Sequence, residues 1–223
     1  MTLYLSRLSL SRSPSAQALS SLLNPEDPAR RMDAHHKLLW AAFSDGPDRQ
    51  RDFLWREGSS GVFLTLSARP PTASDLFAPP EVKDFAPVLA AGDRLAFTLR
   101  ANATRARKGV GRVDVVMDAL HGMPSTERAE GRMVLAQTAG ADWLAGQGAR
   151  AGFSLIHAEV GDYSTVTLPG YRGPRKGQPQ FGVLDLIGVL QVTDPVVFVA
   201  QMAMGFGRAK AYGCGLMLIR RAG

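Results

Sequence analysis

The order in which strand-like and helix-like patterns follow one another constrains this fold most. Residues 3–10 alternate apolar and polar side chains, which is typical of a half-buried strand. In residues 30–43, four side chains recur at spacings that place them on one face of a helix: Met32, His36, Leu39 and Phe43. Two strand patterns follow, 53–55 and 62–67, and the Gly-Ser-Ser-Gly link between them predicts a hairpin.

A proline-punctuated segment runs from Pro70 to Pro87, in which we expect a short helix and a strand over 84–89. The resulting order β-α-β-β-α-β is that of a ferredoxin-like domain. The rest of the chain predicts a second round of the same kind. Strands are expected at 94–100, 154–160, 165–168, 182–192 and 216–219, and helices at 128–149 and 195–204.

The sequence therefore predicts the α+β class, with two tandem ferredoxin-like (RRM-like) domains at residues 1–90 and 91–223. A length of 223 residues, 45% of them apolar, is enough for two such cores. The formal charge is +6. Acids and bases balance before Gly92, so the excess falls in the second half, which favours an anionic partner such as nucleic acid there.

Several classes of protein are excluded by composition. The single cysteine, Cys214, leaves no intrachain disulfide and no cysteine-based zinc site, and the four histidines lack HExxH spacing. The first residues lack a signal-peptide pattern, and Asp194-Pro195 interrupts the most apolar stretch, 185–206. We expect a cytoplasmic protein with no metal, no cofactor and no membrane partner.

The glycine-rich segment 205–216 follows a predicted helix and precedes a predicted strand. A dinucleotide-binding loop has the opposite order, so that interpretation is excluded. Two alternatives remain, an ordinary connection or a turn that approaches a phosphate closely, with Arg208 and Lys210 supplying charge.

Two further basic clusters lie in the second half. They suit a phosphate backbone, with Tyr171 able to stack on a base, and the alternative is a pair of solvated loops. Their members are Arg100, Arg105, Arg107, Lys108 and Arg112, and then Tyr171, Arg172, Arg175 and Lys176.

His35 and His36 stand near the start of the predicted first helix. Histidine is the side chain best suited to proton transfer at neutral pH, and RNA cleavage without a metal needs a base, an acid and cations around the phosphate. The alternative is a partly buried helix histidine. Helical periodicity alone does not separate the two residues.

The order and spacing of several motifs resemble one family across nearly the whole chain. The motifs are His36-x-x-Leu39-Trp40-x-x-Phe43, Arg51-Asp52-Phe53-Leu54, Phe97-Thr-Leu-Arg-Ala-Asn102 and Gly205-x-Gly207-x-x-Lys210-x-x-Gly213-x-Gly215-Leu216. The chain resembles the CasE family, the CRISPR RNA endoribonucleases of the type I-E Cascade complex.

This resemblance implies metal-independent cleavage at the base of a CRISPR repeat stem-loop, leaving 5′-hydroxyl and 2′,3′-cyclic phosphate ends. It also implies that the protein stays on the processed RNA with the other Cascade subunits. The family's catalytic histidine falls on His36, with His35 as the alternative, and Asn102 joins the RNA-binding residues.

Two departures from the family pattern concern the site. Asp33 stands where members often carry tyrosine, and Ala103 stands where they usually carry proline. We expect Asp33 to orient or charge His36 and Lys37 to stabilise phosphate charge. The alternatives are a non-catalytic RNA-binding subunit of the same fold and a small-molecule enzyme of the α+β class.

Overall fold

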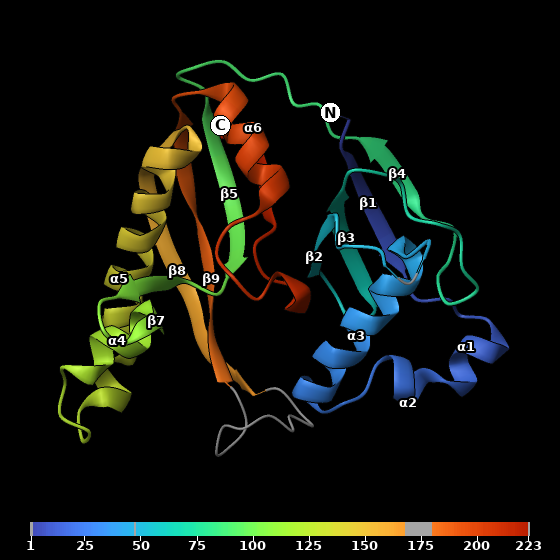
Figure 1. Cartoon of the computed structure of the whole chain (residues 1–223), viewed down its shortest axis with the longest axis horizontal. Coiled ribbons are helices and arrows are strands. Elements are labelled where there is room, and N and C mark those ends of the chain that lie inside the picture. Colours follow the sequence, from blue (N-terminus) through green and yellow to red (C-terminus); the bar gives the residue numbers. More distant parts are fainter. Residues whose placement is uncertain (1, 47, 168–179, 223) are drawn as a thin grey trace. The chain divides into compact units, whose positions relative to one another are not determined.

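The computed structural model describes residues 2–46, 48–167 and 180–222, and the chain forms two compact units (Figure 1). The first comprises Met1–Ala86, Thr167–Pro179 and Lys210–Gly213. The second comprises Pro87–Val166, Gln180–Ala209 and Cys214–Gly223. The chain thus leaves the first unit close to residue 90, and the limits of the two expected domains stay a prediction.

The first unit is built on a four-stranded sheet in the order β2-β3-β1-β4. Its strands are β1 (Tyr4–Ser9), β2 (Phe53–Glu57), β3 (Val62–Ser67) and β4 (Glu81–Asp84). Each neighbouring pair is antiparallel. Helix α3 (Pro28–Phe43) connects β1 to β2, after the short helices α1 (Pro14–Ala18) and α2 (Ser20–Leu23). This is the strand order of a ferredoxin-like domain.

The buried face of α3 differs from the expected one. Leu38, Leu39, Ala42 and Phe43 pack into the core of the first unit, and His35 is buried with them. Met32 and His36 are only half-buried, so the apolar stripe is rotated toward His35. Spacing identified the helix, and of the two histidines that border its apolar stripe, His35 is the buried one.

The connection between β3 and β4 also differs from expectation. Residues 68–80 contain no helix, and the strand is β4 at 81–84 instead of 84–89. The four prolines of this stretch remove backbone donors that a helix would need. Every residue of β4 is exposed, so this edge strand has no apolar alternation to reveal it. The apolar pattern came from the segment that follows, in which Val88 is 88% exposed.

The second unit repeats the plan with the strand order β10-β5-β9-β8. The strands are β5 (Arg94–Ala101), β8 (Phe153–Thr167), β9 (Gln180–Val192) and β10 (Met217–Arg221). Helices α5 (Arg128–Ala151) and α6 (Pro195–Met204) complete it. A Cβ on Gly140 of α5 would lie 3.0 Å from Val160 and 3.3 Å from Leu184, so this helix packs closely on the sheet. The predicted α+β class with two ferredoxin-like domains is confirmed.

Three features of the second unit went beyond the predicted elements. Residues 104–114 form a two-stranded hairpin, β6 (Thr104–Arg107) and β7 (Gly111–Asp114), where a basic passage interrupting the β5 strand pattern was expected. Helix α4 (Val115–His121) follows, with Asp114 accepting hydrogen bonds at its N-terminus. Strand β8 is continuous over the two stretches expected to be separate. Throughout the described ranges, the helices are too short or too polar to cross a membrane.

Candidate functional site

Helix α3 carries both candidate histidines at its centre. Asp27 accepts a 2.7 Å hydrogen bond from the backbone N–H of Arg30, and Pro28 occupies the first turn, so the helix begins at a well-formed cap. Adjacent positions on a helix point about 100° apart. One of the two histidines therefore faces the core while the other reaches its edge.

His35 is the core histidine. Its side chain is 1% exposed, its ring packs 4.7 Å from that of Phe63, and Nε2 lies 3.1 Å from Asn24 Oδ1. Burial, helped by the charge of Arg31, lowers the pKa of His35 to about 4. The ring is therefore neutral at pH 7, and its 3.6 Å approach to Glu57 is not an ion pair. A substrate in solution does not reach this ring.

His36 lies on the same helix at the edge of the core, and its ring lies near two aromatic rings. The ring centroid is 5.6 Å from that of Tyr212 and 6.4 Å from that of Trp40. Its Nδ1 is enclosed and has no hydrogen-bond partner within the described structure.

Charges around His36 act on its pKa in both directions. Burial lowers the pKa most, and the positive charges of Arg51 and Lys37 add to that effect. The negative charge of Asp33 and a hydrogen bond to the Ala211 backbone oppose it. The net result is a pKa below the ordinary value of 6.5, which favours a neutral imidazole at neutral pH.

The turn Lys210–Tyr212 lies against α3 and β2 within the first unit. The indole Nε1 of Trp55 donates a 3.1 Å hydrogen bond to the Ala211 carbonyl. Gly213 follows with φ 76°, and a Cβ there would lie 3.2 Å from the Trp55 ring. Only glycine suits that position, so Gly213 and Trp55 together hold Tyr212 beside His36.

Two cations accompany His36. Burial lowers the pKa of Arg51, and burial together with the charge of Arg51 lowers the pKa of Lys210. Because the charge of Arg51 acts on Lys210, the two cations lie close together, and an anion bound between them would relieve their repulsion. The first unit therefore combines a largely neutral histidine, a phenol and two partly buried cations.

Asp33 and Lys37, also predicted for the site, bind each other one turn apart. Lys37 Nζ donates a 2.7 Å hydrogen bond to Asp33 Oδ2, and the carboxylate raises the pKa of Lys37. Lys37 is 73% exposed. Asp33 thus acts on His36 through its charge, while its carboxylate accepts a hydrogen bond from Lys37.

Most of the predicted RNA-binding residues that the structure describes lie in the second unit. Arg100 forms a 3.0 Å ion pair with Asp185, and the amide of buried Asn102 donates to the Gly182 carbonyl. The backbone N–H of Arg208 donates to the Asn102 carbonyl at 3.0 Å, and the Arg208 side chain is exposed. Asn102 is thus part of the sheet framework.

Four predicted basic residues lie on the β6–β7 hairpin. Arg105 and Arg107 both bind the carboxylate of Asp118 on α4, Arg107 at 2.6 Å. Lys108 and Arg112 are exposed at and near the tip. The remaining predicted residues, Tyr171, Arg172, Arg175 and Lys176, lie outside the described residues.

Arg51 and Tyr212 are the two residues beside His36 that were not assigned from the sequence. Both lie inside motifs that carry the family resemblance, in Arg51-Asp52-Phe53-Leu54 and in the glycine-rich segment. Their position within those motifs could have identified them as site residues from the sequence. Among the described residues, no three His, Cys, Asp or Glu side chains gather as a metal site requires.

Comparisons with known proteins agree with this fold. The CRISPR endoribonuclease Cse3 bound to 19-nucleotide RNA matches at a TM-score of 0.69 and 24% identity, over 98% of this chain and 99% of that one. Thermus thermophilus Cse3, bound to an RNA that represents a pre-cleavage complex, matches at 0.66 and 24%, over 99% and 100%. A chain of a CRISPR RNA-guided surveillance complex matches at 0.59 and 18%, over 98% and 100%.

At these identities the likeness shows a shared fold. No curated protein sequence matches the chain. The family model described as CRISPR associated protein matches residues 3–221, which is nearly the whole length. The chain therefore belongs to the CRISPR-associated protein family, and the resemblance to CasE is confirmed.

Proposed function

We propose that this protein is an endoribonuclease that processes CRISPR RNA, with His36 as its proton-transfer residue. His36 carries the proposal because its lowered pKa favours a neutral imidazole and its ring, unlike that of His35, is only half-buried, beside Tyr212 and the charge of Arg51. The family and the structural relatives named as Cse3 support the coarser part of this proposal, the processing of CRISPR RNA. The substrate is the repeat stem-loop of the precursor RNA.

The reaction divides into two proton transfers around one phosphorus. Neutral His36 takes the proton of a 2′-hydroxyl, whose oxygen attacks the adjacent phosphorus. The bond from phosphorus to the 5′-oxygen breaks, and that oxygen leaves with a proton from an acid. The products are a 2′,3′-cyclic phosphate and a 5′-hydroxyl.

Arg51 and Lys210 stabilise the extra negative charge on the phosphate oxygens during this step. Both are half-buried, and charge stabilisation is stronger where water is excluded. Lys37 is exposed and bound to Asp33, so its contribution is a longer-range one. Tyr212 is the phenol beside His36 and supplies the second proton carrier where the family's usual tyrosine is replaced by Asp33.

The decisive experiment is single-turnover cleavage of the cognate repeat RNA in EDTA. Wild-type protein should cut once without a divalent metal, and a 2′-deoxy nucleotide at the cut site should block the reaction. His36→Ala should slow cleavage by about 10²–10⁴-fold. His121→Ala is the matched control, because His121 is exposed on α4 in the second unit. Undiminished cleavage by His36→Ala, or a need for metal, would overturn the mechanism.

The alternative is a non-catalytic RNA-binding subunit of the same fold. Tight RNA binding by wild-type protein without any cleavage would establish it. The proposed RNA contacts are the same in both cases: Arg100, Asn102, Arg105, Arg107, Lys108, Arg112, Arg208 and Lys210, with Tyr171, Arg172, Arg175 and Lys176.

We also propose that the protein keeps its processed RNA and joins the other Cascade subunits. The structural relative within a CRISPR RNA-guided surveillance complex supports this. Co-elution of the protein with its cleaved 3′-terminal hairpin, and with Cascade subunits only when that RNA is present, would test it. The cytoplasmic location stays a prediction.

A further inference from the structure

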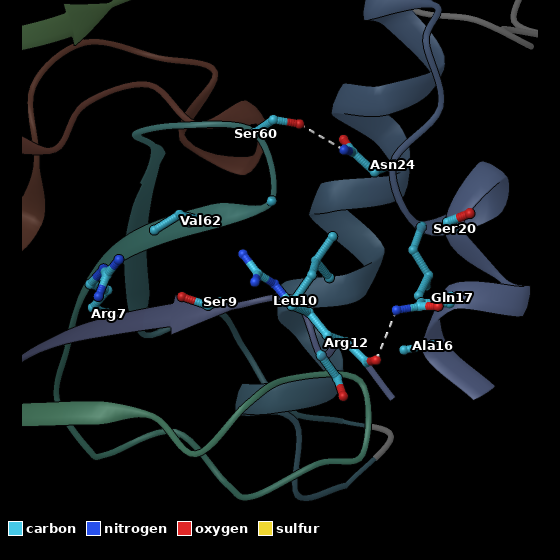
Figure 2. A pocket seen from close by; sticks show the side chains of 13 residues that line it. Arg7, Ser9, Leu10, Arg12, Ala16, Gln17, Ser20, Asn24, Ser60 and Val62 are labelled. Atoms are coloured by element: carbon cyan, nitrogen blue, oxygen red, sulfur yellow. Dashed lines mark hydrogen bonds between the residues drawn. The ribbon is translucent and has the colours of Figure 1, made fainter. Parts of the chain in front are cut away.

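The first unit holds a pocket at the end of β1, and His36 is not among the residues that line it. It measures about 330 Å³ and is enclosed by the end of β1, the start of β3, and helices α1 and α2. In Figure 2, Arg7 and Val62 stand on one side of it and Gln17 and Ser20 on the other. A volume of this size is at the lower end of the range for small-molecule sites, about 300–1,000 Å³.

The charged residues that line this pocket are all positive. Arg7 and Arg12 line it, and no carboxylate is among the lining residues. Arg7 is also bound to Glu81 at 2.7 Å, outside the lining. Arg12 is exposed, and its guanidinium has no ion-pair partner in the described part of the chain. A free guanidinium offers a planar fork of donors that matches a phosphate.

The neutral polar groups of the pocket add hydrogen-bond donors. Asn24 Nδ2 donates to Ser60 Oγ at 2.8 Å, as Figure 2 shows, and Asn24 Oδ1 lies 3.1 Å from His35 Nε2. Ser60 thus accepts one bond, which leaves its own hydroxyl proton to donate. Ser11 Oγ likewise accepts from the Ser13 backbone N–H and keeps its proton. An anion is the ligand that such groups would bind.

Apolar side chains supply the remaining surface of the pocket. Leu10, Ala16, Leu23 and Val62 line it beside the serines and arginines. Such a surface can cover the ribose or base that is attached to a phosphate, and a site for inorganic phosphate alone would not need it. The combination fits one nucleotide unit.

We propose that this pocket binds a phosphate group with its nucleoside, supplied by the backbone of the RNA that the protein holds. Phosphate binding itself rests on the pocket alone, whereas RNA as its source rests on the proposed function. Through Asn24 the pocket wall is hydrogen-bonded to His35, so the RNA strand would be anchored on the unit that carries the cleavage residues.

Two measurements test the proposal on the full-length protein. NMR titration with adenosine monophosphate, and separately with inorganic phosphate, reports binding at the pocket through the amides of residues 9–12 and 60–62. Fluorescence anisotropy of single-stranded-tailed repeat RNA, over a salt series, reports the number of phosphates bound. Arg12→Ala should weaken adenosine monophosphate about tenfold and reduce the salt slope for RNA by about 0.7.

Controls separate this site from general charge and from cleavage. Arg150→Ala removes one exposed arginine at the end of α5 and should leave the RNA salt slope unchanged. Arg12→Lys keeps the charge and should restore most of the slope. Binding of adenosine monophosphate involves no cleavage step, so that readout separates the pocket from cleavage, and circular dichroism verifies that each variant is folded.

Each outcome decides between the sources of the phosphate. A reduced slope in Arg12→Ala alone supports RNA as the ligand. Binding of adenosine monophosphate with an unchanged RNA slope overturns RNA as the source. Absence of both effects overturns the site. If wild-type protein does not cleave the repeat RNA, the proposed function is rejected, while the NMR titration with adenosine monophosphate and phosphate still tests the pocket.

Discussion

Replacing Gly213 with alanine tests whether the 210–213 turn builds the cleavage site. Gly213 has φ 76°, and a left-handed conformation costs a non-glycine residue about 1–2 kcal/mol. Its new Cβ would also lie 3.2 Å from the Trp55 ring, whose side chain is 2% exposed and has no room to retreat. Overpacking of this kind costs about 1–3 kcal/mol more.

Gly92→Ala is the matched control. Gly92 has φ 94°, and nothing lies within 4 Å of a Cβ built there, so this variant carries the conformational cost without the collision. Urea unfolding followed by tryptophan fluorescence should show Gly213→Ala to be less stable than Gly92→Ala by about 1–3 kcal/mol. Displacement of Lys210 and Tyr212 should also slow RNA cleavage at least tenfold in Gly213→Ala, with no change in Gly92→Ala.

Equal stability of the two variants would show that Trp55 does not confine the turn. Wild-type cleavage by a destabilised Gly213→Ala would be more damaging, because it would remove Lys210 and Tyr212 from the mechanism. Trp55→Phe offers an independent check, since it deletes the 3.1 Å hydrogen bond to Ala211 and keeps an aromatic ring.

Two further predictions concern stability and pH. The unfolded chain binds a proton at His35 below pH 6.5 and the folded chain only below about 4, so the free energy of unfolding should fall as the pH drops between these values. His35→Gln should flatten that slope in urea titrations. The hydrogen bond from Arg105 and then the charges of Arg105 and Arg107 lower the pKa of Asp118. The contribution of Asp118 to the free energy of unfolding should therefore be complete above pH 3.8 and be lost as the pH falls through the lowered pKa. Equal acid stability of Asp118→Asn and wild type at every pH would contradict this ion-pair assignment.

The elements that periodicity predicted share one physical property, a face buried against a core. In β5, Leu95, Phe97 and Leu99 are buried and the residues between them are not, so alternation located this strand correctly. Strand β4 is exposed on both faces and is held by backbone hydrogen bonds to β1, which leave no trace in side-chain type. Its position could not be predicted from one sequence.

The periodicity of α3 could not predict which of His35 and His36 is buried. Both residues border the apolar stripe of α3, and which of them is buried depends on contacts with Phe63 and Trp55 on neighbouring strands. Tyr212 reaches His36 because Trp55 binds Ala211, 156 residues further along the chain. Contacts between residues so far apart in the sequence leave no local pattern. The proximity of Tyr212 to His36 could therefore not be predicted, although Tyr212 lies within the glycine-rich motif.

A pair of charge variants with opposite effects tests the electrostatics of His36 directly. Arg51 lowers the pKa of His36 and Asp33 raises it, so Arg51→Gln should shift its titration to higher pH and Asp33→Asn to lower pH. NMR of the imidazole in free protein measures both shifts without RNA. If His36 is the base, the lower limb of the cleavage pH profile at saturating RNA should move with each titration. If the lower limb stays at the same pH in both variants, another group takes the 2′-hydroxyl proton, even if His36→Ala is inactive.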